Sequence, residues 1–413
     1  MCKYCINLKI VFVLFFVLYH LTLINASDII ALSTEQIDVQ NAVDTAITGD
    51  TVFVPSGTST WNSKVTIPND KKITIQGAGV TETIINGNAI TMNQSGSRIT
   101  GFRFNSGEIT VDGDDWRIDH CYFYADSFSN GVRVNGNRKS LHPRGLVDNS
   151  TFVNQRVLVL GWLGLLAHDL WFEPITLGSD YDTVYIEDCT FSSTEHANAI
   201  DSNYGGRYVF RHNILNDIYI EAHSVQGNHR ASRSWEIYDN TINQITRSMW
   251  TPMYLRGGTG VVFNNAITGN WSLPKPTLNN KRDQTASSVC GICDGSSPWD
   301  GNTSGEGGYP CRDQIGRGAD LNLWTDANPY PPQTLDPVYG WNNTYNSSNV
   351  TFTVANQSPI PHILEGRDFY NEPKPGYIPF TYPHPLREGE SSIPEDPEPE
   401  TIVPEPPTKI QLN

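Results

Sequence analysis

The chain has 413 residues, a formal net charge of −16 and only 17% charged residues. Because nucleic-acid binding requires a cationic surface, this composition argues against a nucleic-acid partner. The 34 glycines and the many asparagines and β-branched residues favour a sheet with many turns over a bundle of helices. An acidic glycan remains a compatible partner, since a local arginine cluster or a bridging cation can oppose the overall field.

Residues 1–26 are predicted to be a secretory signal peptide. Lys3 and Lys9 flank the start of an apolar stretch that runs from Ile10 to Leu18, and Asn25-Ala26-Ser27 supplies small residues for cleavage. A short membrane anchor is the alternative. No other segment approaches the ~20 apolar residues that span a bilayer. We therefore expect a secreted or cell-surface protein with no stable membrane span after cleavage.

A short amphipathic helix is predicted at the start of the mature chain. Val39, Ala42, Val43 and Ala46 recur at helical spacing, and Gly49 ends the pattern. Residues 50–55 then alternate like a strand. A helix in this position covers the open end of a stack of strands, which an elongated sheet needs.

A six-residue phrase recurs through the chain, with an apolar residue, a polar corner and a second apolar residue. Its central small or amide residue returns at spacings of 29, 39, 24, 27, 25 and finally 78. A period near 25 indicates a solenoid, because each coil buries its apolar face only against its neighbours. We expect the amides among them to form a hydrogen-bonded ladder with a structural role. The central residues are Cys121, Ser150, Cys189, Asn213, Asn240, Asn265 and Asn343.

Two long spacings predict insertions, one between Ser150 and Cys189 and one over residues 269–337. Insertions on a solenoid gather on one face and often shape its binding site. Three cysteines lie in the second insertion, where a disulfide is favoured in a secreted chain and half a zinc site is the alternative. They are Cys290, Cys293 and Cys311. We assign residues 27–386 to one domain and the Pro/Glu-rich residues 387–413 to a disordered tail or linker.

The pattern resembles the pectate lyase-like superfamily of right-handed parallel β-helix proteins over roughly residues 36–385. Residues 39–55 look like the N-terminal cap and first strand of that superfamily, and Trp116–His120 is similar to the Trp-Ile-Asp-His phrase of pectate lyases. The resemblance implies an all-β, right-handed parallel β-helix with an N-terminal capping helix and long loop insertions.

The resemblance extends to candidate site residues. Ala199-Ile-Asp201 resembles the pectate lyase strand with a calcium-binding aspartate, and Arg247 followed by Tyr254–Gly258 resembles the segment with a catalytic arginine. It therefore implies Arg247 as the base. Arg256 and His223 are the further catalytic candidates, as groups that bind the substrate carboxylate. Glu195, Asp201 and Glu221 are the residues we expect to hold a Ca²⁺ ion, if calcium is a cofactor.

Dividing each coil at its corners places residues 131–135, 199–201, 218–223 and 253–256 on neighbouring strands of one sheet. The register stays open: aligning the glycine pairs 205–206 and 257–258 sets Asp201 opposite Met253, an apolar residue expected to point inward. Corner residues such as Arg211 are expected to be solvated. The candidates for substrate binding are Arg230, Arg233, Arg133, Tyr204, His229 and Trp162.

Elimination from a uronate needs a group that neutralises the substrate carboxylate, a base, and a group that stabilises the leaving oxygen. The sequence thus favours a secreted polysaccharide lyase that cleaves a uronate-containing glycan. A glycoside hydrolase, with two carboxylates such as Asp201 and Glu221, is the first alternative. A non-catalytic adhesin or glycan-binding protein on the same fold is the second. The oligomeric state stays open.

Overall fold

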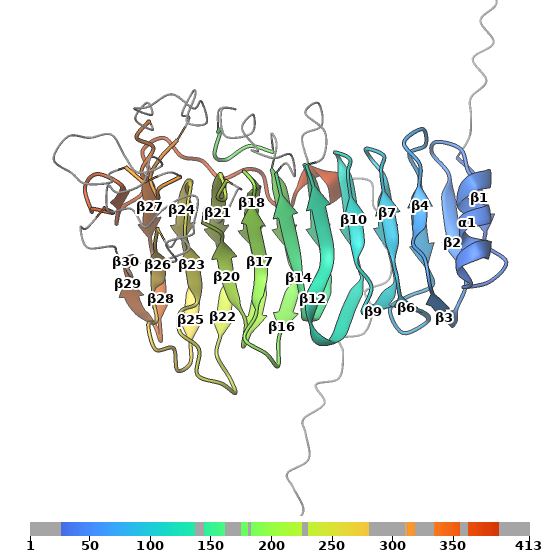
Figure 1. The fold of residues 1–413 in the computed structure, drawn as a ribbon, viewed down its shortest axis with the longest axis horizontal. Helices are drawn as coiled ribbons and strands as arrows, with labels where there is room; N and C mark the ends of the chain where they lie inside the picture. Colours follow the sequence, from blue (N-terminus) through green and yellow to red (C-terminus); the bar gives the residue numbers. More distant parts are fainter. Residues whose placement is uncertain are drawn as a thin grey trace, which may run out of the picture.

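In the computed structural model the chain forms an all-β parallel β-helix, as predicted (Figure 1). The structure describes residues 26–136, 144–161, 175–180, 183–224, 230–280, 310–311, 313–318, 334–355 and 362–387. Each coil contributes one strand to a first sheet, face A, and two strands to a second sheet that folds into faces B and C. All the neighbouring strands are parallel except one terminal hairpin.

Face A is a single stack of parallel strands that runs through the described length of the molecule. In stacking order it contains β1 (Asp28–Ile30), β2 (Thr51–Val54), β5 (Thr74–Gly77), β8 (Arg98–Thr100), β11 (Trp116–Asp119), β13 (Gly145–Asp148), β15 (Val184–Glu187), β18 (Arg207–Arg211), β21 (Ser234–Tyr238), β24 (Thr259–Phe263), β27 (Val338–Trp341) and β31 (Phe369–Tyr370).

Face B follows the first corner of each coil. It contains β3 (Gly57–Trp61), β6 (Thr83–Gly87), β9 (Arg103–Asn105), β16 (Thr190–Ser192), β19 (Ile214–Asn216), β22 (Thr241–Asn243), β25 (Ala266–Thr268), β28 (Asn343–Tyr345) and the antiparallel β29 (Ser348–Val350).

Face C follows the second corner. It contains β4 (Val65–Ile67), β7 (Ile90–Met92), β10 (Ile109–Val111), β17 (Asn198–Asn203), β20 (Tyr219–Ala222), β23 (Met253–Leu255), β26 (Pro276–Leu278) and β30 (Thr353–Val354). Two long strands run through both faces and join them, β12 (Tyr122–Asn135) and β14 (Thr151–Leu160).

The core is built from equivalent residues of successive coils. Phe104, Phe123, Phe152 and Phe191 are fully buried and stack on one another, with ring centroids 5.5, 4.6 and 4.7 Å apart. Parallel strands lie about 4.8 Å apart, so aromatic rings at one position of each coil meet at stacking distance. The same interval brings outward side chains of adjacent coils into contact.

The corner between faces A and B explains the repeated phrase. The central amides form the predicted ladder: Asn240 Nδ2 donates to Asn265 Oδ1 at 2.9 Å, and Asn265 Nδ2 donates to Asn343 Oδ1 at 2.8 Å. The residue before each central residue has a positive φ between 46° and 56°, a conformation that Asn, Asp and His tolerate best. These are His120, Asn149, Asp188, His212, Asp239, Asn264 and Asn342.

Helix α1 (Gln36–Thr45) covers the first coil, as the sequence predicts (Figure 1). Val39 and Val43 are fully buried, with Ala42 and Ala46 beside them. The helix packs against β2, β3 and β4. It thereby shields the apolar end of the stack from water.

The end of the described chain returns along face A as a strap, residues 377–387, which ends in the 3₁₀ turn η1 (Pro385–Arg387). Tyr377, Phe380 and Leu386 of the strap pack against an apolar cluster on the outer side of face A. Leu146 and Tyr185 in that cluster are fully buried. The strap therefore covers the outer side of face A from β13 to β27.

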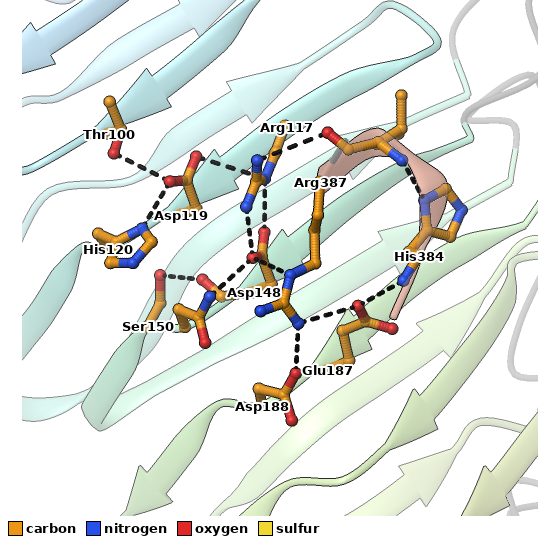
Figure 2. Close-up of polar contacts among 12 residues, drawn as sticks. Thr100, Arg117, Asp119, His120, Asp148, Ser150, Glu187, Asp188, His384 and Arg387 are labelled. Atoms are coloured by element: carbon orange, nitrogen blue, oxygen red, sulfur yellow. Dashed lines mark hydrogen bonds and ion pairs between the residues drawn. The ribbon is translucent and has the colours of Figure 1, made fainter. Parts of the chain in front are cut away.

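Polar contacts hold the strap to three neighbouring strands (Figure 2). Arg387 contacts Asp188 Oδ2 at 2.5 Å and Asp148 Oδ2 at 3.5 Å, and the backbone N–H of His384 donates to Glu187 Oε1 at 2.9 Å. Asp148 also forms two hydrogen bonds with Arg117, at 2.7 and 2.9 Å. Burial raises the pKa of Asp148 to about 6 despite these partners.

Arg211 is not solvated as expected, because the strap buries it completely. Its guanidinium binds Glu187 Oε2 at 2.6 Å and donates to the backbone carbonyls of Phe380 and Thr381, each at 2.8 Å. The sequence pattern did not reveal this pair because the strap lies about 170 residues downstream.

Several predictions fall outside the described residues: positions 1–25 of the predicted signal peptide, Cys290 and Cys293, and the tail beyond Arg387. Cys311 is buried, and its predicted disulfide stays a prediction. Among the described residues no helix is long and apolar enough to cross a membrane.

The ladder predicts a large stability difference between two asparagines of one coil. Asn240 is buried and donates to three oxygens, so Asn240→Leu leaves buried carbonyls unpaired and is expected to lower the unfolding free energy by about 2–4 kcal/mol. Asn243→Leu, at a half-buried position in β22, is the control and is expected to cost under about 1 kcal/mol. Urea unfolding measures both, and equal losses would contradict a structural role for the ladder.

His384 of the strap predicts one component of the stability that is lost in acid. Burial, with the nearby Arg211 and Arg117, lowers the pKa of His384 from 6.5 to about 4, and its Nδ1 accepts a hydrogen bond from the N–H of Leu386. The unfolded state therefore binds more protons between these pH values, so stability present above pH 6.5 is lost as the pH falls towards 4. The expected contribution is up to about 3 kcal/mol. The unfolding free energy of His384→Gln, measured against pH, should lack this component. A pH profile equal to that of the unmodified protein would contradict the prediction.

Candidate active site on face C

The strand register decides which residues face outward on face C. Ile220 pairs with Ile200 on one side and with Met253 on the other, and all three side chains are fully buried. The residues that follow them along the chain therefore point out of the coil: Asp201, Glu221 and Tyr254. Because Ile200 lies level with Met253, the match of Asp201 with Met253 that follows from aligning the glycine pairs is wrong.

Three of the predicted residues form one cluster. Asp201, Glu221 and His223 each place a donor atom within 4.8 Å of the others. His223 Nδ1 lies 3.4 Å from Asp201 Oδ2 and 3.9 Å from Glu221 Oε1. Arg256 joins them, because its Nη2 contacts Glu221 Oε1 and lies 2.9 Å from His223 Nδ1. The structure thus brings together residues up to 55 positions apart.

The cluster is buried and its charges are coupled. Burial by itself raises the pKa of Asp201, but the hydrogen bond and charge of His223, with Arg156 and Arg256, bring it below its ordinary value. Burial also opposes the charge of His223, yet its contact with Asp201 raises its pKa.

Glu221 is the centre of the hydrogen bonds. Its Oε2 accepts from the hydroxyl of Tyr219 at 3.0 Å and from the amide of Asn198, while its Oε1 accepts from Arg256. Burial, together with Glu221, raises the pKa of Tyr219 well above its usual range. Tyr219 therefore keeps its hydroxyl proton and donates it in a hydrogen bond to the Glu221 carboxylate.

A hollow of about 420 Å³ opens over this cluster. Its rim is aromatic: the rings of Trp250 and Tyr254 lie 4.9 Å apart in an edge-to-face arrangement, and the guanidinium carbon of Arg256 lies 4.7 Å from the Tyr254 ring centroid. Flat rings beside polar groups are suited to binding a sugar. The residues lining it include His196, Tyr219, Glu221, Trp250, Tyr254 and Arg256.

The donor set does not match calcium well. Ca²⁺ takes six to eight oxygen ligands. Here two carboxylates and one imidazole are available, and Arg156 and Arg256 already neutralise those carboxylates. Of the carboxylate oxygens of Asp201 and Glu221, only Asp201 Oδ1 is buried without a hydrogen bond. Glu195, the third predicted ligand, is exposed and outside the cluster. The residues of the cluster therefore do not fit a Ca²⁺ ion.

Arg247 lies in a different environment from the cluster. Its guanidinium donates to the backbone carbonyls of Thr194 and Asp217, each at 3.1 Å, and to that of Glu195. These carbonyls belong to turns of the two preceding coils, so Arg247 joins three turns. By donating to these carbonyls, the Arg247 guanidinium acts as a clamp that holds the turns together. The predicted role of Arg247 as base stays a prediction.

The predicted substrate-binding residues are dispersed. Arg230 is fully buried and binds Asp313 of the second insertion, with three contacts between 2.6 and 2.9 Å, so it anchors the insertion instead of facing the groove. Arg233 is also buried. Tyr204 lies in a turn with φ of 55°, and Arg133 pairs with Glu108 at 3.1 Å on face C. His229 and Trp162 lie outside the described residues.

Sequence reasoning missed Arg156 and Asn198. Arg156 contacts Asp201 Oδ2 at 3.2 Å and Asn198 Oδ1 at 2.9 Å. The alternation of buried Val157 and Val159 in β14 marks Arg156 as outward-facing, which was the available signal. Because β14 bends from face B to face C, the sequence pattern did not show on which face of the coil Arg156 lies.

Comparisons with known proteins leave the family open. No family model and no curated protein matches the chain. Among solved structures, an alginate lyase from Paenibacillus sp. str. FPU-7 is similar at a TM-score of 0.33 and 13% identity, over 62% of this chain and 99% of that chain. A similarity this distant carries no argument about the site, and membership of the pectate lyase-like superfamily stays a prediction.

The clamp geometry predicts what Arg247→Ala does. Loss of its donors is expected to lower the unfolding free energy by about 1–2 kcal/mol and to speed amide exchange in the turns around Thr194 and Asp217. Hydrogen exchange followed by mass spectrometry measures this effect. Arg103→Ala, whose guanidinium lies over Tyr122 on face B, is the control. Unchanged protection in those turns, with loss of activity, would instead support the role as base.

Proposed function

We propose that this protein is a secreted polysaccharide lyase that cleaves a uronate-containing glycan by β-elimination on face C. The observation that carries the proposal is the meeting of Arg256, Tyr219 and Glu221 at the wall of one aromatic hollow. These groups supply a cation for the substrate carboxylate, an acid and a base. Secretion rests on the predicted signal peptide.

Arg256 is the group proposed to bind the uronate carboxylate. Its planar fork suits two parallel hydrogen bonds to a carboxylate, and in the free protein it is held by Glu221. A substrate carboxylate that takes the place of Glu221 on Arg256 has its charge neutralised. Neutralisation acidifies the neighbouring C–H bond, and it also frees Glu221 Oε1 to act as base.

The proton balance closes within the cluster. Glu221 takes the proton from the carbon beside the carboxylate, and the C–H electrons form the new C=C bond as the glycosidic C–O bond breaks. The leaving oxygen takes the hydroxyl proton of Tyr219, and Glu221 returns its proton to Tyr219 through their 3.0 Å hydrogen bond. His223, held by Asp201, positions Arg256 through the 2.9 Å contact.

A hydrolase is supported less well by the same residues. Hydrolysis of a glycoside requires a protonated carboxylic acid with a raised pKa, facing a second carboxylate. The pKa of Asp201 is lowered instead, and Glu221 is paired with Arg256. A binding protein without activity is an outcome of the experiment below.

The proposal predicts an absorbance rise from unsaturated products when the mature protein is incubated with a panel of uronate polymers. Glu221→Gln and Tyr219→Phe are each expected to lower the rate by about 10²–10⁴, since each removes one proton-transfer group. Arg256→Lys keeps the charge but loses the fork, so it should also lower the rate. Tyr124→Phe, an exposed hydroxyl on β12, is the matched control.

Each other outcome assigns a different function. New reducing ends without absorbance would establish a hydrolase, and glycan binding with neither signal would establish a binding protein. Full activity of Glu221→Gln would remove the proposed base. Loss of activity on chelation, restored by calcium, would show that an ion takes part after all.

A further inference from the structure

A second hollow lies along face C, towards the N-terminal end from the first. Its volume is about 560 Å³, and it opens at the corner between faces B and C. Lys64 precedes β4, Glu108 precedes β10, Phe128 lies in β12, and Arg156 lies in β14. With Asn88, which lies between β6 and β7, five neighbouring coils build it, and no residue of the proposed reaction lies within it.

The hollow carries an excess of positive charge in an acidic protein. Lys64 Nζ lies 3.5 Å from Glu108 Oε1, and Arg133 Nε lies 3.1 Å from Glu108 Oε2. Two cations thus contact this one carboxylate, and a third, Arg156, lines the hollow while it pairs with Asp201. The whole chain has a net charge of −16. The side chain of Lys64 is 27% exposed, so its ammonium reaches solvent. Local cations of this kind favour an anionic ligand against the overall field.

The wall of the hollow also suits a sugar ring. Phe128 is half-buried, with the guanidinium carbon of Arg156 5.3 Å from its ring centroid. Asn130 donates to Glu108 Oε2 at 3.0 Å and accepts from Arg156 Nε at 2.8 Å. A flat apolar face beside fixed polar groups is the composition expected of a carbohydrate subsite.

Arg156 connects the two hollows. It lines the second hollow and also binds Asp201 and Asn198 of the first cluster. The strands from β10 through β12, β14 and β17 to β20 are consecutive neighbours. Four spacings of about 4.8 Å separate the centres of the hollows by about 19 Å along face C. That length accommodates several linked sugar rings.

We propose that the second hollow is a distal subsite, in which Lys64, Arg156 and Phe128 hold a further uronate of the same glycan chain. The inference rests on the proposed function, and it narrows the substrate to a long acidic polymer that is bound across face C and cut within the chain. Short oligosaccharides reach only one of the two hollows.

The test measures binding apart from turnover. In a Glu221→Gln background, calorimetry gives the Kd for uronate oligosaccharides from disaccharide to octasaccharide. Lys64→Ala and Phe128→Ala are each expected to weaken octasaccharide binding about tenfold and to leave disaccharide binding unchanged. Lys72→Ala, an exposed lysine before face A, is the matched control, and Lys64→Arg should restore binding.

Equal weakening at both lengths, or none at the octasaccharide, would overturn the distal subsite. So would equally tight binding of an uncharged octasaccharide, because the hollow would then not recognise carboxylates. Length-dependent binding of uronates without any elimination by the unmodified protein would uphold the subsite and overturn the lyase. The two proposals therefore fail separately.

Discussion

The fixed interval between parallel coils is the constraint on which the rest of the structure depends. Backbone hydrogen bonds set neighbouring strands about 4.8 Å apart, so a residue that faces outward in one coil must contact its equivalents above and below. In the core this produces the stack of phenylalanines, and at the corner it produces the asparagine ladder. On face C it produces the contacts among Asp201, Glu221 and Arg256.

An ion pair between an arginine and a glutamate occurs on face A and again on face C, but the strap covers only the first. On face A, Arg211 and Glu187 form a fully buried ion pair, and the strap supplies carbonyls for the remaining guanidinium N–H groups. On face C, Arg256 and Glu221 form a similar pair at the edge of a hollow, with no strap over it among the described residues. An anionic ligand that displaces Glu221 would accept the hydrogen bonds that Arg256 donates to Glu221 in the free protein.

Charge balance also explains why a negative protein is a reasonable partner for a negative polymer. The overall charge repels a polyanion at long range, but salt screens that field within about 8 Å at physiological ionic strength. Four cations, Lys64, Arg133, Arg156 and Arg256, are nevertheless spread along face C between β4 and β23. Recognition is then a matter of local contacts, which these cations are able to provide.

The sequence by itself determined the architecture, because stacking requires a repeat and a repeat is visible in a single chain. The period near 25, the ladder of Asn213, Asn240 and Asn265, and the capping residues Val39 and Val43 all follow from which side chains must be buried together. It also placed Asp201, Glu221, His223 and Arg256 on one face. Only the tertiary structure decided their register, since Ile200 and not Asp201 lies level with the inward-facing Met253. Likewise, Arg230 met Asp313 and Arg211 met the strap through contacts between distant segments, which no local pattern encodes.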